Sequence, residues 1–183
     1  PNSVTSIGTS AFSGCSSLTS PVYNAHCFAY MPTSYSGVYA IPEGIKQIAG
    51  GAFFECSFLT SVTIPEGVTE IGSSAFHSCS GLTLVTIPEG VTSIGGCAFA
   101  GCSGLTSVTI PSNVTSIGNY AFQYCSGLTS VTFEGVPPTV GSWVFDNVPS
   151  GCKGYYPSTK ASAWEAVISN GTWKGLTMEE VED

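Results

Sequence analysis

The sequence predicts a solenoid in which each 23-residue repeat contributes one short strand to a parallel sheet. Three observations predict this fold: a phenylalanine, an isoleucine and a cysteine each return at a constant interval of 23 residues. The phenylalanine column consists of Phe53, Phe76, Phe99, Phe122 and Phe145. A period of about 20 to 50 residues indicates a stack of units, each of which buries its apolar face only against its neighbours.

The other two columns keep the same interval. The isoleucine column consists of Ile41, Ile64, Ile87, Ile110 and Phe133, and the cysteine column of Cys56, Cys79, Cys102 and Cys125, after which Val148 takes the cysteine position. Stacked parallel strands lie about 4.8 Å apart. Each column is therefore expected to become a ladder of equivalent side chains in contact.

One repeat contains three elements in order. Residues 105–110, LTSVTI, alternate at their end, with Val108 and Ile110 inward and Thr109 outward, which predicts a strand with one buried face. Pro111 ends this strand because it cannot donate a ladder hydrogen bond. Residues 113–117, NVTSI, predict a second short extended segment. Residues 118–125, GNYAFQYC, predict a single helical turn opened by Gly118.

The pattern LTSVTIPxxVTSIGxxAFxxCSGL, in which x marks variable positions, resembles the 23-residue leucine-rich repeat of the BspA-like type. That family occurs in surface proteins of anaerobic bacteria and in some parasitic protists. The resemblance covers residues 4 to about 148 and is specific, because many positions coincide in several successive copies. It implies a curved leucine-rich repeat solenoid with a parallel sheet on one face. It also implies a bacterial, secreted or cell-surface protein that acts in adhesion.

One rung departs from the repeat. Cys15 and Cys56 are 41 residues apart, where two repeats of 23 would need 46, so the rung at residues 20–40 is shortened and irregular. It carries five aromatic residues: Tyr23, Phe28, Tyr30, Tyr35 and Tyr39. These rings either fill the defective rung or form an exposed patch that receives a partner. The repeat array, with this rung included, is predicted to span residues 1–148.

Residues 149–183 predict a C-terminal cap with a strand, a short helix and an acidic tail. The last rung of a solenoid exposes an apolar end that must be covered. The segment 155–157, YYP, predicts the strand, and the segment 158–168 predicts a helix with Ser158 or Thr159 as its N-cap. Trp164, Val167 and Ile168 share one helical face.

The cover for the last rung is expected from Trp164 and Trp173. Four of the last five residues are acidic, which predicts a solvated tail. The N-terminal end has no comparable lid in the sequence, which predicts self-association at an uncapped first rung.

Composition excludes several classes of function. The chain has 4 basic and 12 acidic residues and a formal net charge of -8, so it lacks the basic stripe that nucleic acids and anionic membranes require. Hydrophobic residues make up 43% and charged residues 9%, which excludes an ordinary disordered chain. No apolar run reaches the roughly 18 residues of a membrane span, which predicts no membrane insertion. The sequence opens within a repeat, so we expect a mature product or a segment of a longer chain.

The eight cysteines are expected to be free thiols, most of them buried. Column residues, among which Cys15 is counted, point the same way along the stack, which suits neither a disulfide nor a zinc site, and there is no C-x₂-C pair. Buried thiols that fill the core suit the packing behaviour of cysteine. Cys97 lies outside the column and is expected to be exposed. The sequence leaves open whether Cys27, Cys97 or Cys152 is reactive or bridged.

No catalytic, metal-binding or cofactor-binding residue is predicted, and no cofactor. The chain has no H-E-x-x-H, phosphate-loop or dinucleotide motif. His26 beside Cys27 is the only Cys/His pair in the sequence, and an enzyme that used it would be the third hypothesis for function. His77 is expected to face solvent. The column of Glu43, Glu66 and Glu89 either is hydrated in a turn or holds a hard cation.

The outward residues of the LTSVTI strands predict a flat surface of small hydroxyl groups. These residues are Ser61, Thr63, Leu84, Thr86, Ser107, Thr109, Ser130 and Thr132. Such a surface suits broad contact with a protein or a carbohydrate on a host or neighbouring cell, although threonine is also simply a good strand former. The sequence therefore predicts a non-catalytic, extracellular or cell-surface binding module. The alternative is a passive spacer or scaffold.

Overall fold

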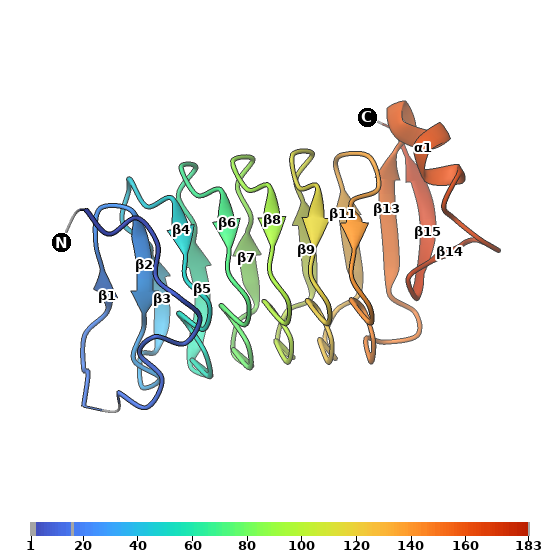
Figure 1. Cartoon of the computed structure of the whole chain (residues 1–183). Helices are drawn as coiled ribbons and strands as arrows, with labels where there is room; N and C mark the ends of the chain where they lie inside the picture. The colour runs from blue at the N-terminus through green and yellow to red at the C-terminus, as the bar shows by residue number, and fades with distance from the viewer. Residues whose placement is uncertain (1–2, 16, 183) are drawn as a thin grey trace.

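The computed structural model describes residues 3–15 and 17–182 and confirms a solenoid of parallel strands with little helix (Figure 1). Each regular rung contributes two strands, one to each of two opposite faces. On one face the strands are two residues long, except for β2, and on the other they are three to six residues long, except for β14. We call these the short-strand face and the long-strand face.

The short-strand face is a single seven-stranded sheet in the order β1-β2-β4-β6-β8-β10-β12. Its strands are β1 (Val22–Tyr23), β2 (Cys27–Tyr30), β4 (Gln47–Ile48), β6 (Glu70–Ile71), β8 (Ser93–Ile94), β10 (Ser116–Ile117) and β12 (Thr139–Val140). From β2 to β12 all neighbours are parallel, and from β4 on each strand lies 23 residues after the last, as where Ile94 pairs with Ile71 and Ile117. The second extended segment predicted in each repeat is therefore a strand.

The long-strand face is divided into two sheets. The first has the order β3-β5-β7, and the second the order β9-β11-β13-β15-β14. The strands are β3 (Gly37–Ala40), β5 (Leu59–Thr63), β7 (Leu84–Thr86), β9 (Ser107–Ile110), β11 (Ser130–Phe133), β13 (Lys153–Pro157), β14 (Thr172–Trp173) and β15 (Leu176–Val181). Strands β7 and β9 are in contact, but they belong to different sheets. The ladder of this face is thus interrupted in the middle of the array.

The segment between the two strands of a rung is a run of tight turns rather than the predicted helical turn. In one rung the N–H groups of Ala98, Ala100 and Cys102 donate to carbonyl groups three residues earlier. Two residues of the same segment, Cys97 and Gly101, have left-handed backbone conformations, with φ values of 55° and 75°. A right-handed helix cannot pass through left-handed residues, so the segment stays a series of turns.

The core of the solenoid is a file of stacked phenylalanine rings. The rings of Phe28, Phe53, Phe76, Phe99, Phe122 and Phe145 follow one another with centroids 4.7 to 5.5 Å apart and interplanar angles of 4 to 16°. All of these rings are buried. Rings stacked in this way bury large apolar surfaces against each other. The predicted phenylalanine ladder is confirmed, with Phe28 as an additional member from the irregular rung.

The cysteine column runs beside the rings and is buried as predicted, except at its first member. The thiols of Cys79, Cys102 and Cys125 lie 3.0, 3.1 and 3.2 Å from the carbonyl oxygens of the phenylalanines one rung earlier. Burial raises the pKa of Cys56 and of Cys125 to about 12. Cys15 is exposed, so its predicted place in the buried column is wrong.

The remaining cysteines outside the column are also free. Cys27 and Cys152 are buried, and Cys97 is partly exposed. Burial raises the pKa of Cys152 to about 11. All eight cysteines are free in the structure, including Cys27, Cys97 and Cys152, for which the sequence left bridging open.

The N-terminal end of the stack is covered, contrary to the expectation of an uncapped first rung. Strand β1 pairs antiparallel with β2 and closes the short-strand face. The rings of Tyr23 and Tyr39 lie 5.9 and 5.7 Å from the ring of Phe28, the first ring of the file. The N–H of Ser10 donates to the carbonyl of Gly50 at 2.7 Å, so the N-terminal segment also bonds to the next rung. The first ring of the file is thus covered by two tyrosines, and self-association at this end stays a prediction.

The C-terminal cap continues the long-strand face and closes the core with indole rings. Strands β13 and β15 add to β11 in parallel, and β14 pairs antiparallel with β15. Trp164 lies in α1 (Ala161–Glu165), is fully buried, and donates its Nε1–H to the carbonyl of Gly135 at 2.9 Å. Trp173 contacts it edge-on at 5.0 Å. Both tryptophans cover the last rung as predicted.

Two details of the cap differ from the sequence prediction. Lys160 occupies the N-cap of α1, without a side-chain cap bond, and Val167 is exposed because the helix ends at Glu165. Glu179 lies in β15 and forms an ion pair of 2.8 Å with Lys153. The start of the acidic stretch is therefore part of a strand rather than a solvated tail.

Candidate binding surfaces

Two rows of outward side chains cross the long-strand face. One row contains Val38, Ser61, Leu84, Ser107, Ser130 and Lys153, and the other contains Ala40, Thr63, Thr86, Thr109, Thr132 and Tyr155. The register of the ladders on either side of the break aligns these positions rung by rung. The structure thus brings together all eight sheet residues named from the sequence.

Five of these eight residues are exposed, and Ser61, Ser130 and Thr132 are half-buried. Leu84 is 55% exposed and Val38, in the same row, is 64% exposed. Sequence analysis named Leu84 as the one large apolar residue of the face and missed Val38. The signal was available, because Val38 stands 23 residues before Ser61.

A cleft of about 390 Å³ opens on this face where the ladder is interrupted. We call it the sheet cleft. Four of the predicted residues line it: Leu84 and Thr86 from β7, and Ser107 and Thr109 from β9. Glu66, Glu89 and Glu134 line it as well. Residues that the sequence placed on a uniform surface are therefore grouped around one opening.

The three glutamates reach the sheet cleft from the turns that follow the long strands. Glu66 and Glu89 hold the same repeat position, directly after a proline. Glu134 stands where the three preceding repeats have Pro65, Pro88 and Pro111, and its N–H donates to the carbonyl of Ile110 at 3.0 Å. Sequence analysis missed Glu134, although its replacement of a repeated proline was a usable signal.

Glu89 and Glu134 interact directly. Partial burial raises the pKa of Glu134, and the hydrogen bond to Glu89 and the charge of Glu89 raise it further. Ser112 Oγ donates to Glu89 Oε2 at 3.3 Å, and Asn113 Nδ2 donates to the backbone carbonyl of Glu89 at 3.0 Å. The two glutamates thus share the rim of the sheet cleft.

No basic side chain lines the sheet cleft. In the part of the chain that the structure describes, the single ion pair is that of Lys153 and Glu179. Within those same residues, no group of three or more His, Cys, Asp or Glu is arranged to hold a metal ion. The three glutamates therefore present negative charge to solvent.

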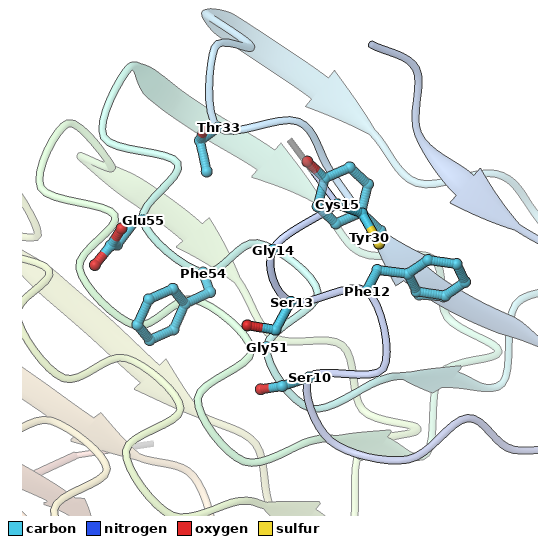
Figure 2. Close-up of a pocket in the computed structure, with 11 residues that line it drawn as sticks. Ser10, Phe12, Ser13, Gly14, Cys15, Tyr30, Thr33, Gly51, Phe54 and Glu55 are labelled. Carbon is cyan, nitrogen blue, oxygen red and sulfur yellow. The ribbon is translucent and has the colours of Figure 1, made fainter. Parts of the chain in front are cut away.

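A second cavity, of about 300 Å³, lies at the N-terminal end of the array (Figure 2). Its walls come from the N-terminal segment, from the residues around β2, and from the turn at residues 51–55. Phe12, Tyr30 and Phe54 supply aromatic surface, Glu55 supplies a carboxylate, and the exposed thiol of Cys15 also lines it.

The aromatic residues of the irregular rung do not form one exposed patch. Phe28 is completely buried in the file of rings, so the structure removes it from the candidate partner-binding residues. Tyr35 and Tyr39 pack against the core, and the hydroxyl of Tyr35 donates to the carbonyl of Val38 at 2.7 Å. Tyr30 is partly buried, and Tyr23 is 50% exposed. Most of these rings fill the end of the stack.

His26 and Cys27 do not form a reactive pair. The Cys27 thiol is fully buried, lies 3.7 Å from the carbonyl of Phe28, and has a pKa that burial raises. A nucleophilic cysteine needs the opposite, a lowered pKa and access to a substrate. His77 stacks on Phe54 at 5.0 Å and is partly exposed.

The sequence analysis missed five exposed aromatic residues: Phe54, Phe58, Tyr120, Tyr124 and Trp143. Tyr120, Tyr124 and Trp143 are 37%, 57% and 63% exposed and lie in the turn segments of two successive rungs. All three have left-handed backbones, with φ near 60°, 58° and 59°. Other repeats place Gly51 or Gly101 at equivalent positions, where this conformation carries no steric cost. The sequence pattern treats these positions as variable, which concealed the rings.

The repeat pattern of the BspA-type leucine-rich repeat region matches this chain in six copies, over residues 1–27 and 22–151. No curated protein matches the chain. None of the helices among the described residues is long and apolar enough to cross a membrane. Proteins with this repeat and this fold are typically non-enzymatic binding modules.

Three solved structures are similar to the chain along much of its length. A leucine-rich cell surface protein from Faecalibacterium prausnitzii is 27% identical with a TM-score of 0.73, and the match covers 94% of this chain and 50% of that protein. A leucine-rich repeat protein from Eubacterium ventriosum is 27% identical with a TM-score of 0.57, over 62% of this chain and 31% of the other. The T. pallidum leucine-rich repeat protein is 26% identical with a TM-score of 0.56, over 91% and 78%. The chain thus spans half or less of the length of the first two proteins.

Proposed function

This chain belongs to the BspA-type leucine-rich repeat family, and from that premise we propose that it is a non-catalytic adhesion module that binds its partner through the long-strand face. The partner is a protein or a carbohydrate on a host or neighbouring cell. The residues proposed to contact it are Ser61, Thr63, Leu84, Thr86, Ser107, Thr109, Ser130 and Thr132.

The observation that carries this proposal is the grouping of exposed residues around the sheet cleft. Leu84 is 55% exposed at a position where the two neighbouring rungs have Ser61 and Ser107. A single exposed leucine is common on protein surfaces and needs no ligand, so the proposal depends on the place of Leu84 in the lining of the sheet cleft, beside Thr86, Ser107 and Thr109. Binding gives this side chain a role that folding does not.

A cell-surface or secreted location is part of the same proposal. The Faecalibacterium protein is described as a leucine-rich cell surface protein. The formal net charge of -8 favours solubility and disfavours contact with anionic lipid or nucleic acid. The similarity to the Faecalibacterium protein is our reason for proposing a cell-surface location.

The second candidate function is a passive spacer that presents other parts of a longer surface protein. The rows of serine and threonine favour it, because threonine is a good strand former and these residues have no need of a ligand.

A second, smaller candidate surface for adhesion consists of the tyrosines of the irregular rung. Each of their rings is at least partly exposed: Tyr23, Tyr30, Tyr35 and Tyr39.

Replacement of Leu84 by serine tests adhesion against the spacer function. The variant Leu84→Ser gives this position the residue found in the two neighbouring rungs, Ser61 and Ser107, so the fold is expected to be unchanged. We expect binding to a panel of purified extracellular-matrix proteins and to an array of glycans to fall about fivefold to tenfold, because an apolar contact is lost. Surface plasmon resonance on the best-bound probe measures the change.

Val136→Ser is the matched control, since Val136 is 54% exposed and does not line the sheet cleft. It should leave binding unchanged. Equal binding by wild type and Leu84→Ser, or no binding to any probe, would exclude adhesion through this face and favour the spacer.

A further inference from the structure

We propose that the sheet cleft receives a lysine or arginine side chain from an extended segment of the protein partner. This inference rests on the proposed function and makes it more specific, since it names a protein with a basic segment and excludes a neutral carbohydrate. It concerns one position on the long-strand face, between β7 and β9.

The first argument is charge complementarity. Glu66, Glu89 and Glu134 surround the sheet cleft, and no basic residue lines it. Glu89 and Glu134 both line the cleft, and the pKa of Glu134 is raised by partial burial and by its interaction with Glu89, because like charges near each other repel. A cation placed between them removes this repulsion, so binding gains energy from an interaction that the isolated chain lacks.

The second argument concerns which cation fits. The described carboxylates are not arranged as a metal site. An ammonium or guanidinium group needs no such coordination sphere, because its N–H groups donate to separate carboxylate and hydroxyl oxygens. The hydroxyls of Thr86, Ser107 and Thr109 lie around the same opening and supply further acceptors.

The third argument is the apolar wall beside the glutamates. Leu84 lines the sheet cleft and is largely exposed. Lysine and arginine carry apolar stems that pack on hydrophobic surface while the charged group stays with its polar partners. The Leu84 side chain can pack on the apolar stem of such a residue, and the neighbouring carboxylates can bind its charged group. This combination does not match a small inorganic cation or a sugar hydroxyl.

The extended form of the partner follows from the surface around the cleft. The two outward rows run across successive strands on both sides of the opening, and their members next to it are mostly serine and threonine. A strand-like segment presents alternate side chains to one side. It can therefore place one basic side chain in the cleft and small residues over the two outward rows.

The test uses three short synthetic peptides that alternate threonine with lysine, glutamine or glutamate. We expect the wild-type chain to bind the lysine peptide and neither of the others, as measured by isothermal titration calorimetry. The variant Glu89→Gln with Glu134→Gln should lose about tenfold in affinity, because it removes the paired carboxylates. The control Glu165→Gln with Glu180→Gln changes the net charge equally at exposed sites away from the cleft and should change affinity less than threefold.

Misfolding does not obscure this result. Because the fold raises the pKa of Glu134, its ionised form opposes folding at neutral pH. Replacement by glutamine removes that cost and, at residue 89, keeps an oxygen that can accept from Ser112 and Asn113, so the melting temperature of the double variant is measured beside its binding. An unchanged melting temperature with lost binding therefore reports on the cleft alone.

Two outcomes would overturn the inference: no binding of the lysine peptide by wild type, or equal loss in the two double variants, which would show attraction by net charge only. Failure of the proposed function looks different. If Leu84→Ser loses a matrix or glycan probe while Glu89→Gln with Glu134→Gln retains it, adhesion stands and the basic segment does not.

Discussion

The cysteine column shows how a position within the repeat determines the chemistry of a single residue. Cys79, Cys102 and Cys125 each lie 3.0 to 3.2 Å from a phenylalanine carbonyl oxygen of the rung before and are fully buried. Cys15 has the same spacing to a phenylalanine, Phe12, yet it is exposed. Cys15 lies in the N-terminal segment and lines the open cavity there, instead of packing beside the file of rings.

We predict that thiol labelling of the native chain divides the eight cysteines into two groups. Cys15 and Cys97 should react within minutes at pH 8 with a chromogenic disulfide reagent, and the other six only on unfolding. Burial raises the pKa of Cys56 and Cys125 to about 12, so their thiolates are rare at that pH. Labelling followed by peptide mapping identifies the reactive positions, and rapid modification of Cys102 would contradict its burial.

The raised pKa values also give a direction for stability. In the fold these thiols stay neutral, whereas in the unfolded chain they ionise near pH 9. Their contribution is complete below about pH 9 and is lost as the pH rises toward the folded values. The free energy of unfolding should therefore fall as the pH rises from about 9 toward about 12.

At this scale the sequence was informative wherever the period held. The interval of 23 residues identified the buried phenylalanines and cysteines from Cys56 onward without any structure. It failed at Phe28, which lies 25 residues before Phe53, because the shortened rung shifts its backbone and brings this ring into the file. The spacing of residues in the sequence cannot show how the backbone accommodates a shortened rung.

Among the elements, the C-terminal cap determines how the array ends. The indole of Trp164 contacts Phe133 at 4.8 Å and Tyr156 at 5.6 Å, and its Nε1–H bonds to Gly135. These contacts join α1, β11 and β13 into one unit. The cap therefore buries the apolar end of the last rung, as each rung buries the apolar face of its neighbour.

We predict that Trp164→Phe lowers the free energy of unfolding by about 2 to 4 kcal/mol. The change leaves the buried carbonyl of Gly135 without its donor, which costs about 1 to 3 kcal/mol, and it also leaves a small cavity. Trp143→Phe is the matched control, because Trp143 is 63% exposed, and it should change stability by less than about 0.5 kcal/mol. Urea unfolding followed by circular dichroism measures both, and equal effects would refute the role of the cap.

The candidate site was only partly predictable at the scale of elements. Alternation in LTSVTI placed the outward serines and threonines correctly, because a strand has a fixed period of two. The interruption between β7 and β9 was not predictable, since the repeats on both sides have the same length and nearly the same residues. Only Leu84, in place of serine, and Glu134, in place of proline, mark the position in the sequence.

Across the whole molecule, stability is a chain of nearest-neighbour contacts. Phe99 stacks on Phe76 and Phe122, and each of these stacks on one further ring. Backbone bonds from Cys97, Phe99 and Gly101 to the following rung repeat the same coupling. Removal of one ring therefore acts on two interfaces.

We predict that Phe99→Ala lowers the free energy of unfolding by about 3 to 5 kcal/mol, the usual range for a buried phenylalanine. Because each rung contacts only the next, hydrogen exchange should accelerate most in residues 76–122 and least in the C-terminal cap. Hydrogen exchange with mass spectrometry measures this profile. Uniform acceleration along the chain would instead indicate a fully cooperative fold.

The regular register of the long-strand face has a consequence for how many copies of a partner the chain can hold. In most successive rungs a serine lies beside a serine and a threonine beside a threonine. One rung of this face therefore presents nearly the same surface as the next. A ligand that reads only these rows would find several equivalent positions and distribute itself among them. Leu84 distinguishes one position from the repeated ones. A ligand that must contact Leu84 therefore binds at that position alone, with a stoichiometry of one per chain.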